Sequence, residues 1–424
     1  MRKLILSFFL CSAACAFAQT AREEIHQDIH RSGSNLLAYE TPTKALTPTP
    51  KGYEPFFINH YGRHGSRWLL NDGIYSGPIK TLKKAKEANK LTFKGEELLE
   101  KLEKFYPCTV DRLGDLTTVG ERQHHGIGKR MTENFPEVFK GNAFVDAKST
   151  VVIRCILSMT AECEEITAFN KDINMHNDVS EAFQHYLNYS GDKKLKDAKG
   201  KGWRTVQEYK DKLTHPDRFC SVVFLDGENF FKEKKDAKHF MRQIFELCSN
   251  MQSHDTDIDL YDLFTEEEAY DLWKITNIDW YVNYGPAPIS DGVAPYSQRF
   301  LLRNMIETAD TIVTSDNHGA VLRFGHEVCV MPLACLLELD SCGREVKNLD
   351  ELDSKWVNFR IYPMGCNIQL IYYRPKKGNG EILVKALLNE KEATLPIPTD
   401  NYPYYSWNKI REYYINKLDA YKED

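Results

Sequence analysis

Apolar positions along the chain follow two patterns, which separate strand-forming ends from a helical middle. Short runs of aromatic and β-branched residues at 56–58, 151–153 and 321–324 predict buried strands. From about residue 165 to residue 276, aromatic and charged residues recur at helical spacing with few β-branched runs. We therefore predict an α/β part built from both ends of the chain, with a helical part inserted between them.

The same patterns predict further elements. Leu, Ala and Phe spaced among lysines and glutamates predict a helix over 79–102 that is broken near 91–95. We also predict helices over 298–309 and 404–421, and a pair of strands within 357–374. All of these elements are expected to be scaffold.

Residues 114–123 contain the start of another helix. Thr117 or Thr118 is placed to cap its N-terminus, and Glu121 is placed to complete a capping box. We interpret this segment as structural, although a helix N-terminus is also a ready site for an anion.

The first residues have the pattern of an export signal. Arg2 and Lys3 precede an apolar stretch that ends near residue 15, and a small-residue cleavage site follows at 16–18. The alternative, a membrane anchor, does not fit, because crossing a bilayer takes about 20 apolar residues and this stretch is shorter. We expect residues 1–18 to be cleaved and the mature chain to be secreted or periplasmic, with no membrane span.

Composition is typical of a globular enzyme. Of the 424 residues 42% are hydrophobic, and the formal net charge of −6 gives no reason to expect a nucleic-acid partner. Two of the 11 cysteines lie in the predicted signal, so an odd number remains and at least one thiol is unpaired. Cys342 and Cys366 are candidates for a disulfide, a pairing that the sequence leaves open. No cysteine and histidine spacing indicates a metal site.

Candidate chemistry is concentrated between Asn59 and Trp68. Arg63, His64 and Arg67 lie around a glycine directly after the first predicted strand, where open α/β sheets bind ligands. Two arginines so close together repel each other unless an anion lies between them. Taken alone, however, His64 could equally be a hydrogen-bonded histidine in a turn.

Two other strand ends carry polar residues. Arg154 directly follows the run at 151–153, and His326 and Glu327 follow the run at 321–324. A carboxylic acid there can protonate the leaving group of a transfer reaction. In isolation, Arg154 is more typical of a surface residue and Glu327 of a salt bridge at a strand end.

The extended pattern R-H-G-x-R after a strand resembles the signature of the histidine acid phosphatases, a family that includes phytases and the multiple inositol polyphosphate phosphatases. The resemblance implies that His64 is the nucleophile and that Arg63 and Arg67 hold the phosphoryl group. Leu69 stands where the family commonly has proline, a departure that concerns the stiffness of the loop more than the chemistry.

Three more segments are similar to family motifs. Residues 116–123 match L-T-x-x-G-x-x-Q, and Lys148 to Arg154 resembles R-S-T-x-x-x-R with lysine in first place, which implies that Arg154 is a third phosphate ligand. The segment L-R-F-G-H is similar to the proton-donor segment and implies that His326 is a phosphate ligand and Glu327 the proton donor. The triplet His-Glu-Val departs from both the His-Asp and the His-Ala-Glu forms of the family.

The resemblance implies a fold and a domain division. We expect an α/β domain with a mainly parallel sheet flanked by helices, as in phosphoglycerate mutase, formed by residues 19–164 and 277–424. Residues 165–276 are expected to form a smaller, all-helical cap domain.

The predicted function is that of a secreted phosphomonoesterase with a phosphohistidine intermediate. Inositol polyphosphates such as phytate are the expected substrates, with 2,3-bisphosphoglycerate as a further one, and no cofactor or metal is expected. A broad acid phosphatase acting on small sugar phosphates is one alternative. A phosphate-binding protein without activity is another, and the oligomeric state is not predicted.

Overall fold

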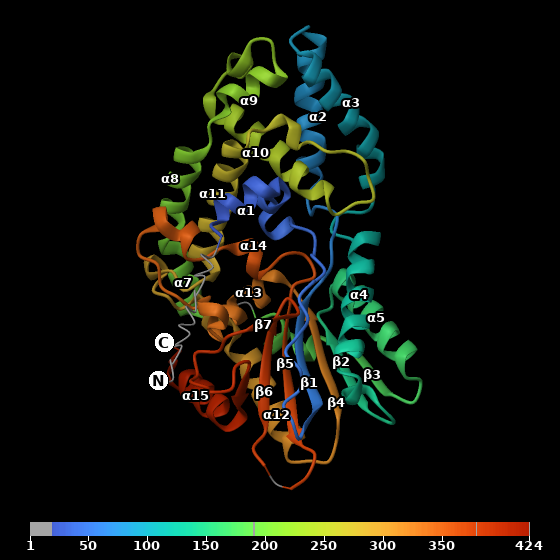
Figure 1. Ribbon diagram of the computed structural model, residues 1–424. Coiled ribbons are helices and arrows are strands. Elements are labelled where there is room, and N and C mark those ends of the chain that lie inside the picture. The colour runs from blue at the N-terminus through green and yellow to red at the C-terminus, as the bar shows by residue number, and fades with distance from the viewer. Residues whose placement is uncertain (1–18, 190, 379, 424) are drawn as a thin grey trace, which may run out of the picture.

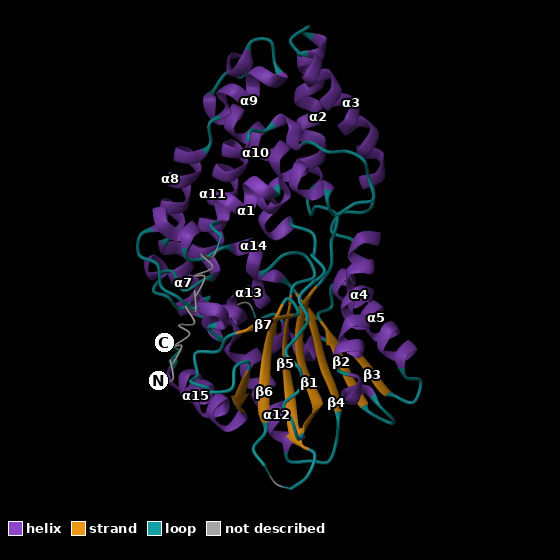
Figure 2. Ribbon diagram, viewed as in Figure 1, coloured by secondary structure: helices purple, strands orange, loops and turns teal. Residues whose placement is uncertain are grey.

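The structure is a computed structural model that describes residues 19–189, 191–378 and 380–423 (Figure 1). A sheet occupies one end of the molecule and a group of helices stands beyond the edge where its central strands end (Figure 2). The predicted signal, residues 1–18, lies outside the described residues. Among the helices that are described, none combines the length and the apolar character needed to cross a membrane.

Eight strands form one mixed sheet in the order β3-β2-β4-β1-β5-β6-β7, with β8 paired to β6. The four strands from β3 to β1 in this order are mutually parallel, and β5 to β8 pair antiparallel. The strands are β1 (Tyr53–Arg63), β2 (Phe144–Ser149), β3 (Asn174–Val179), β4 (Gly319–Gly325), β5 (Asn367–Pro375), β6 (Leu383–Leu388), β7 (Lys391–Ala393) and β8 (Tyr404–Ser406).

Helices cover both faces of the sheet and form the rest of the molecule. They are α1 (Ala21–Gln27), α2 (Asp72–Glu87), α3 (Phe93–Phe105), α4 (Thr118–Asn134), α5 (Ile153–Phe169), α6 (Gln184–Leu187), α7 (Lys193–Lys201), α8 (Trp203–Leu213), α9 (Pro216–Val223), α10 (Lys234–Met251), α11 (Glu266–Tyr284), α12 (Arg299–Val313), α13 (Glu327–Leu336), α14 (Asn358–Ile361) and α15 (Trp407–Ala420). The predicted α/β class with an added helical part is confirmed.

Alternation along the strands sends side chains into two cores. On β4, Ala320, Leu322 and Phe324 join apolar residues of α4 and α5, whereas Val321 joins those of α12, α13 and α15. Successive residues of a strand point to opposite faces, so a strand that is apolar at nearly every position must be covered on both sides. This double covering fixes the register of the central strands.

The helices beyond the sheet have an apolar core of their own. Buried residues of α2 and α3 pack there with buried residues of α9, α10 and α11. In Figure 1 these helices stand together at the end of the molecule away from the strands. The division into a cap of residues 165–276 and a discontinuous α/β domain stays a prediction.

Parallel pairing places the candidate residues at one edge of the sheet. Arg63, the last residue of β1, is directly opposite Gly325, the last residue of β4. The amide of His64 continues the pairing and donates to the Gly325 carbonyl at 3.0 Å, and that of Thr150, after β2, donates to Phe324 at 3.0 Å. The ends of β1, β2 and β4 therefore lie side by side at one edge of the sheet.

Several local predictions are corrected. The run at 151–153 is not a strand, because β2 ends at Ser149 and α5 begins at Ile153, so Arg154 lies in the first turn of a helix. Val151 and Ile153 are 42% and 65% exposed. Without a partner strand, their β-branched side chains did not decide the local structure.

Three further predictions change. Thr117 caps α4 as expected, but its side chain accepts from the amide of Gly120, and Glu121 lies one residue too far along to close a capping box. The strand pair expected within 357–374 is instead β5 with β6. Cys342 and Cys366 are both buried free thiols.

Candidate active site

The loop after β1 carries His64 in one defined orientation. The side chain is fully buried, and Nδ1 lies 2.8 Å from the carbonyl oxygen of Gly65. A carbonyl only accepts hydrogen bonds, so Nδ1 carries the ring proton and Nε2 keeps its lone pair. Burial lowers the pKa of His64 well below its usual value, and the Arg63 and Arg154 charges act in the same direction against the opposing influence of Glu327. The imidazole is therefore neutral, with the Nε2 lone pair available.

The start of α4 holds this loop. The amide of Ser66 donates to Gln123 Oε1 at 2.8 Å, and Gln123 Nε2 donates to Ser66 Oγ at 3.0 Å. A β-carbon on Gly65 would lie 2.4 Å from the carbonyl oxygen of Gly120, so the helix approaches the loop more closely than any other residue permits. The segment 116–123 therefore positions the loop.

Three arginines surround His64 and keep donors that are unused within the described residues. Arg63 is fully buried, and its Nη1 donates to the carbonyl oxygens of Asn35 at 2.7 Å and Tyr362 at 3.0 Å. Its Nη2, together with Nε of Arg67 and Nε of Arg154, is buried with no hydrogen-bond partner among the described residues. Buried unpaired N–H groups of a guanidinium are costly, which indicates that they await an anion.

Arg67 is buried close to the other two arginines. Burial lowers the pKa of Arg67 to about 10, and the charges of Arg63 and Arg154 add to this effect while Glu327 and Glu246 oppose it. Its Nη1 donates to the carbonyl of Trp68 at 2.9 Å. An anion placed among the guanidinium groups would relieve their mutual repulsion.

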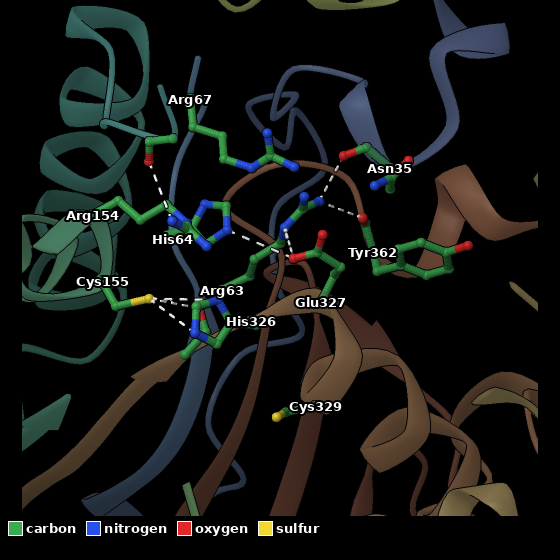
Figure 3. Close-up of polar contacts among 12 residues, drawn as sticks. Asn35, Arg63, His64, Arg67, Arg154, Cys155, His326, Glu327, Cys329 and Tyr362 are labelled. Atoms are coloured by element: carbon green, nitrogen blue, oxygen red, sulfur yellow. Dashed lines mark hydrogen bonds and ion pairs between the residues drawn. The ribbon is translucent and has the colours of Figure 1, made fainter. Parts of the chain in front are cut away.

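Glu327 begins α13 and faces both Arg63 and His64. Its Oε2 lies 3.1 Å from Arg63 Nε and 3.6 Å from His64 Nε2 (Figure 3). Burial alone would raise the pKa of this carboxyl, but the charges of Arg63 and Arg67 hold it well below its usual value. The carboxylate therefore occupies the position of an anion in the site.

His326 lies on the other side of His64, at the end of β4. Its ring centre is 5.6 Å from that of His64, and Nε2 is 3.5 Å from Thr150 Oγ1. Burial lowers the pKa of His326 to about 4, with smaller contributions from the surrounding charges. A neutral His326 can donate one hydrogen bond to an oxygen of a bound anion.

One possible metal-ligating atom from each of His64, His326 and Glu327 lies within 4.8 Å of the other two, so the spacing alone would suit a metal ion. The three arginines around them oppose this, because a divalent cation would be repelled where an anion is attracted. The charge of the site favours an oxyanion.

All six residues predicted from the sequence meet at this edge, and Figure 3 shows Arg63, His64, Arg67, Arg154, His326 and Glu327 converging from three segments of the chain. Their individual roles stay predictions. No pattern in the sequence indicated that the carbonyl groups of Asn35 and Tyr362 orient Arg63. Backbone groups carry no side-chain signature, so only the fold reveals them.

A second feature missed from the sequence is a cavity of about 420 Å³ that begins at Arg67 and Asn35. Its walls include Lys210 of α8 and Arg242 and Glu246 of α10. The only sequence signal was the polar spacing on one face of the predicted helix around 230–251.

No protein-family model matches the chain, and no curated protein matches it. Solved structures do. Bifidobacterium longum multiple inositol polyphosphate phosphatase in complex with phosphate aligns with a TM-score of 0.75 and 16% identity, over 92% of this chain and 98% of that one. The phytase of D. castellii aligns with a TM-score of 0.71 and 15% identity, over 92% and 85%.

Hafnia alvei phytase in its apo form aligns less closely, with a TM-score of 0.54 and 13% identity over 87% of this chain and 98% of that one. Identities this low establish a shared fold. The chain therefore has the α/β fold of these multiple inositol polyphosphate phosphatase and phytase structures, as its resemblance to the histidine acid phosphatases predicts.

Proposed function

We propose that this protein is a phosphomonoesterase that hydrolyses inositol polyphosphates through a phosphohistidine at His64. The observation that carries the proposal is the set of unpartnered buried N–H groups of Arg63, Arg67 and Arg154 around the unprotonated Nε2 of His64. A phosphoryl group satisfies these donors with its equatorial oxygens while its phosphorus faces the imidazole.

The reaction has two steps. In the first, the Nε2 lone pair of His64 attacks phosphorus, a P–N bond forms, and the P–O bond to the leaving group breaks. The leaving oxygen takes a proton from Glu327, because an alkoxide departs poorly without one. In the second, a water molecule loses a proton to the Glu327 carboxylate and attacks phosphorus, and the P–N bond breaks to release phosphate.

Glu327 has to be protonated before it can act as the acid. In the free site Arg63 keeps it ionised. A bound phosphoryl group competes for Arg63 and places negative charge beside the carboxylate, and both effects raise the pKa of Glu327. Substrate binding thereby favours the protonated form that the first step requires.

The cavity next to Arg67 supports a substrate with several phosphates. Its volume of about 420 Å³ and its cationic residues Lys210 and Arg242 suit a polyanion better than an uncharged sugar ring. In another structure of the B. longum phosphatase the ligand is inositol hexasulfate. We include 2,3-bisphosphoglycerate as a smaller substrate of the same charge type.

A substrate panel tests the proposal. We expect phosphate release from phytate and p-nitrophenyl phosphate, with phytate and 2,3-bisphosphoglycerate preferred over glucose 1-phosphate in kcat/KM. His64→Ala should abolish turnover without unfolding the protein, while His185→Ala, a control at an exposed histidine, should not. A preference for glucose 1-phosphate would favour the broad acid phosphatase, and binding of phosphate without any turnover would favour the non-catalytic alternative.

We also propose that the chain is exported. The proposal rests on the pattern of residues 1–18, with cleavage after Ala18. Protein recovered from the producing cell should then begin at Gln19, which N-terminal sequencing measures. A mature chain that still begins at Met1 would contradict export by this route.

A further inference from the structure

One face of α10 is polar and lines the cavity beside the phosphate site. Most pairs of the residues that form this face are three, four or seven positions apart, which places them on one side of a helix. They are His239, Arg242, Gln243, Glu246 and Ser249. The opposite side of the helix is apolar and buried in the core of the helical part.

This cavity adjoins the proposed phosphate site. Arg67 belongs to both the cavity wall and the phosphate site. Asn35, another wall residue, orients Arg63 through its carbonyl oxygen at 2.7 Å. When these arginines hold one phosphoryl group of a substrate, the ring of that substrate and its remaining substituents therefore lie against α10.

Most charges of the wall have partners, but one does not. Lys210 of α8 pairs with Asp279 of α11 at 3.2 Å, and Arg242 donates to Thr214 Oγ1 at 3.3 Å. Glu246 makes no hydrogen bond or ion pair within the part of the chain that the structure describes. Its carboxyl group lines the cavity within electrostatic range of Arg67. A carboxylate in that place is unexpected in a site that binds phosphates.

We propose that Glu246 determines which inositol phosphates are accepted, by opposing a substrate whose second phosphate lies next to the one being cleaved. The inference rests on the proposed function. An ionised Glu246 repels a neighbouring phosphate, whereas it accepts a hydrogen bond from a hydroxyl group in the same place. The protein then discriminates between a fully phosphorylated ring and one that already carries a hydroxyl beside the reacting phosphate.

The discrimination depends on pH with a defined sign. Burial raises the pKa of Glu246 and the Arg67 charge opposes the rise. The other charged or titratable groups facing the cavity are Lys210, Asp279, His239 and Arg242, and Tyr75 of α2 also interacts electrostatically with Glu246. As pH rises, the ionised fraction of Glu246 grows, so the repulsion of a neighbouring phosphate grows with it.

The test compares kcat/KM for phytate and for p-nitrophenyl phosphate, which has no second phosphate, between about pH 4 and about pH 7.5. We expect Glu246→Gln to raise the phytate to p-nitrophenyl phosphate ratio on the order of tenfold near neutral pH, and to change it little at the acidic end. Asp236→Asn removes an exposed acid of the same helix that does not line the cavity. Its ratio should follow that of the unaltered protein at every pH.

The outcomes separate the two proposals. Turnover of both substrates with the same ratio for the unaltered protein and Glu246→Gln would overturn the role of Glu246 and leave the proposed function standing. A ratio that changes equally at all pH values would also overturn it, since a structural effect has no reason to follow ionisation. Absence of turnover by the unaltered protein would overturn the proposed function and this inference together.

Discussion

The proposed phosphate site and the cavity beside it both contain basic residues, but they hold these charges in different ways. Arg63, Arg67 and Arg154 bury N–H groups that have no hydrogen-bond partner among the residues that the structure describes. In the cavity, Lys210 already pairs with Asp279 at 3.2 Å. Unsatisfied buried donors cost free energy that an arriving anion recovers, whereas a paired and partly solvated charge gains little from one. The first region is suited to strong binding of one group, and the second to discrimination among the groups around it.

The largest effect that this contrast predicts is at Glu327. Glu327→Gln removes both the proton donor and the base that activates water, so phytate hydrolysis should fall by about 10²- to 10⁴-fold. With p-nitrophenyl phosphate, whose leaving group needs no proton, the first step should lose much less. A burst of p-nitrophenol followed by a slow phase, measured by stopped-flow absorbance, is the expected result.

Two variants sharpen the Glu327 test. Glu307→Gln, at an exposed acid of α12, is the matched control and should behave like the unaltered protein. Glu327→Asp shortens the side chain by one methylene and should retain appreciable activity if the segment works like the His-Asp form of the family. Equal losses on both leaving groups without a burst would mean that the proton comes from another residue.

The next largest effect concerns the pH dependence of protein stability and involves the region around His64 rather than the cavity. The pKa of His326 is about 4 in the folded chain, against an ordinary value of 6.5. The unfolded chain therefore takes up the proton first as pH falls below 6.5, and the stability due to neutral His326 is lost between 6.5 and 4. Between pH 7 and pH 5, the free energy of unfolding of His326→Gln should therefore fall by about 2 kcal/mol less than that of the unaltered protein. Urea unfolding measures this difference.

His185→Gln, at an exposed position, serves as the control for this measurement and should show the same loss as the unaltered protein. Identical pH dependence of unfolding for His326→Gln and the unaltered protein would show that His326 is not held neutral by burial.

A smaller effect is expected in the cavity. Lys210→Ala removes a cation that faces the distal phosphates, so KM for phytate should rise by roughly tenfold while kcat changes less, because the reacting centre is untouched. Lys212→Ala removes a neighbouring lysine of α8 that pairs with Asp350 at 3.0 Å and does not line the cavity. Equal KM values for the two variants would contradict a role of the cavity in substrate binding.

The smallest effect is the response to chelators. In the proposed mechanism Arg63, Arg67 and Arg154 neutralise the phosphoryl oxygens, a task that metal ions perform in many phosphatases. Incubation with EDTA should therefore leave the rate of phytate hydrolysis unchanged. Loss of activity that a divalent ion restores would contradict this assignment of charge neutralisation.

The proposed phosphate site could be predicted from the sequence because most of its residues are grouped in two short segments at the ends of strands. Arg63, His64 and Arg67 lie within five positions after a strand, and His326 and Glu327 are adjacent after another. Parallel pairing then brings the two strand ends together. Short-range order in the sequence was enough to place these side chains at one edge.

The cavity could not be predicted in the same way. The helical pattern around α10 was visible, but which charges face a cavity depends on how α8, α10 and α11 pack, and that is decided by contacts distant in sequence. Arg154 shows the same limit on a smaller scale. Its β-branched neighbours predicted a strand, but they have no partner strand among the described residues, and α5 begins at Ile153 instead. Propensity yields to tertiary context in both places.

The central claim is that His64 becomes covalently phosphorylated. The direct measurement uses Glu327→Gln, in which slow dephosphorylation lets the intermediate accumulate, mixed with labelled p-nitrophenyl phosphate and quenched in alkali. A phosphohistidine is stable in alkali and labile in acid, and mass spectrometry should place the label on the peptide containing His64. We predict one label per chain, absent when His64→Ala is added. Turnover without any alkali-stable label, or a label that persists in the His64→Ala protein, would contradict the account.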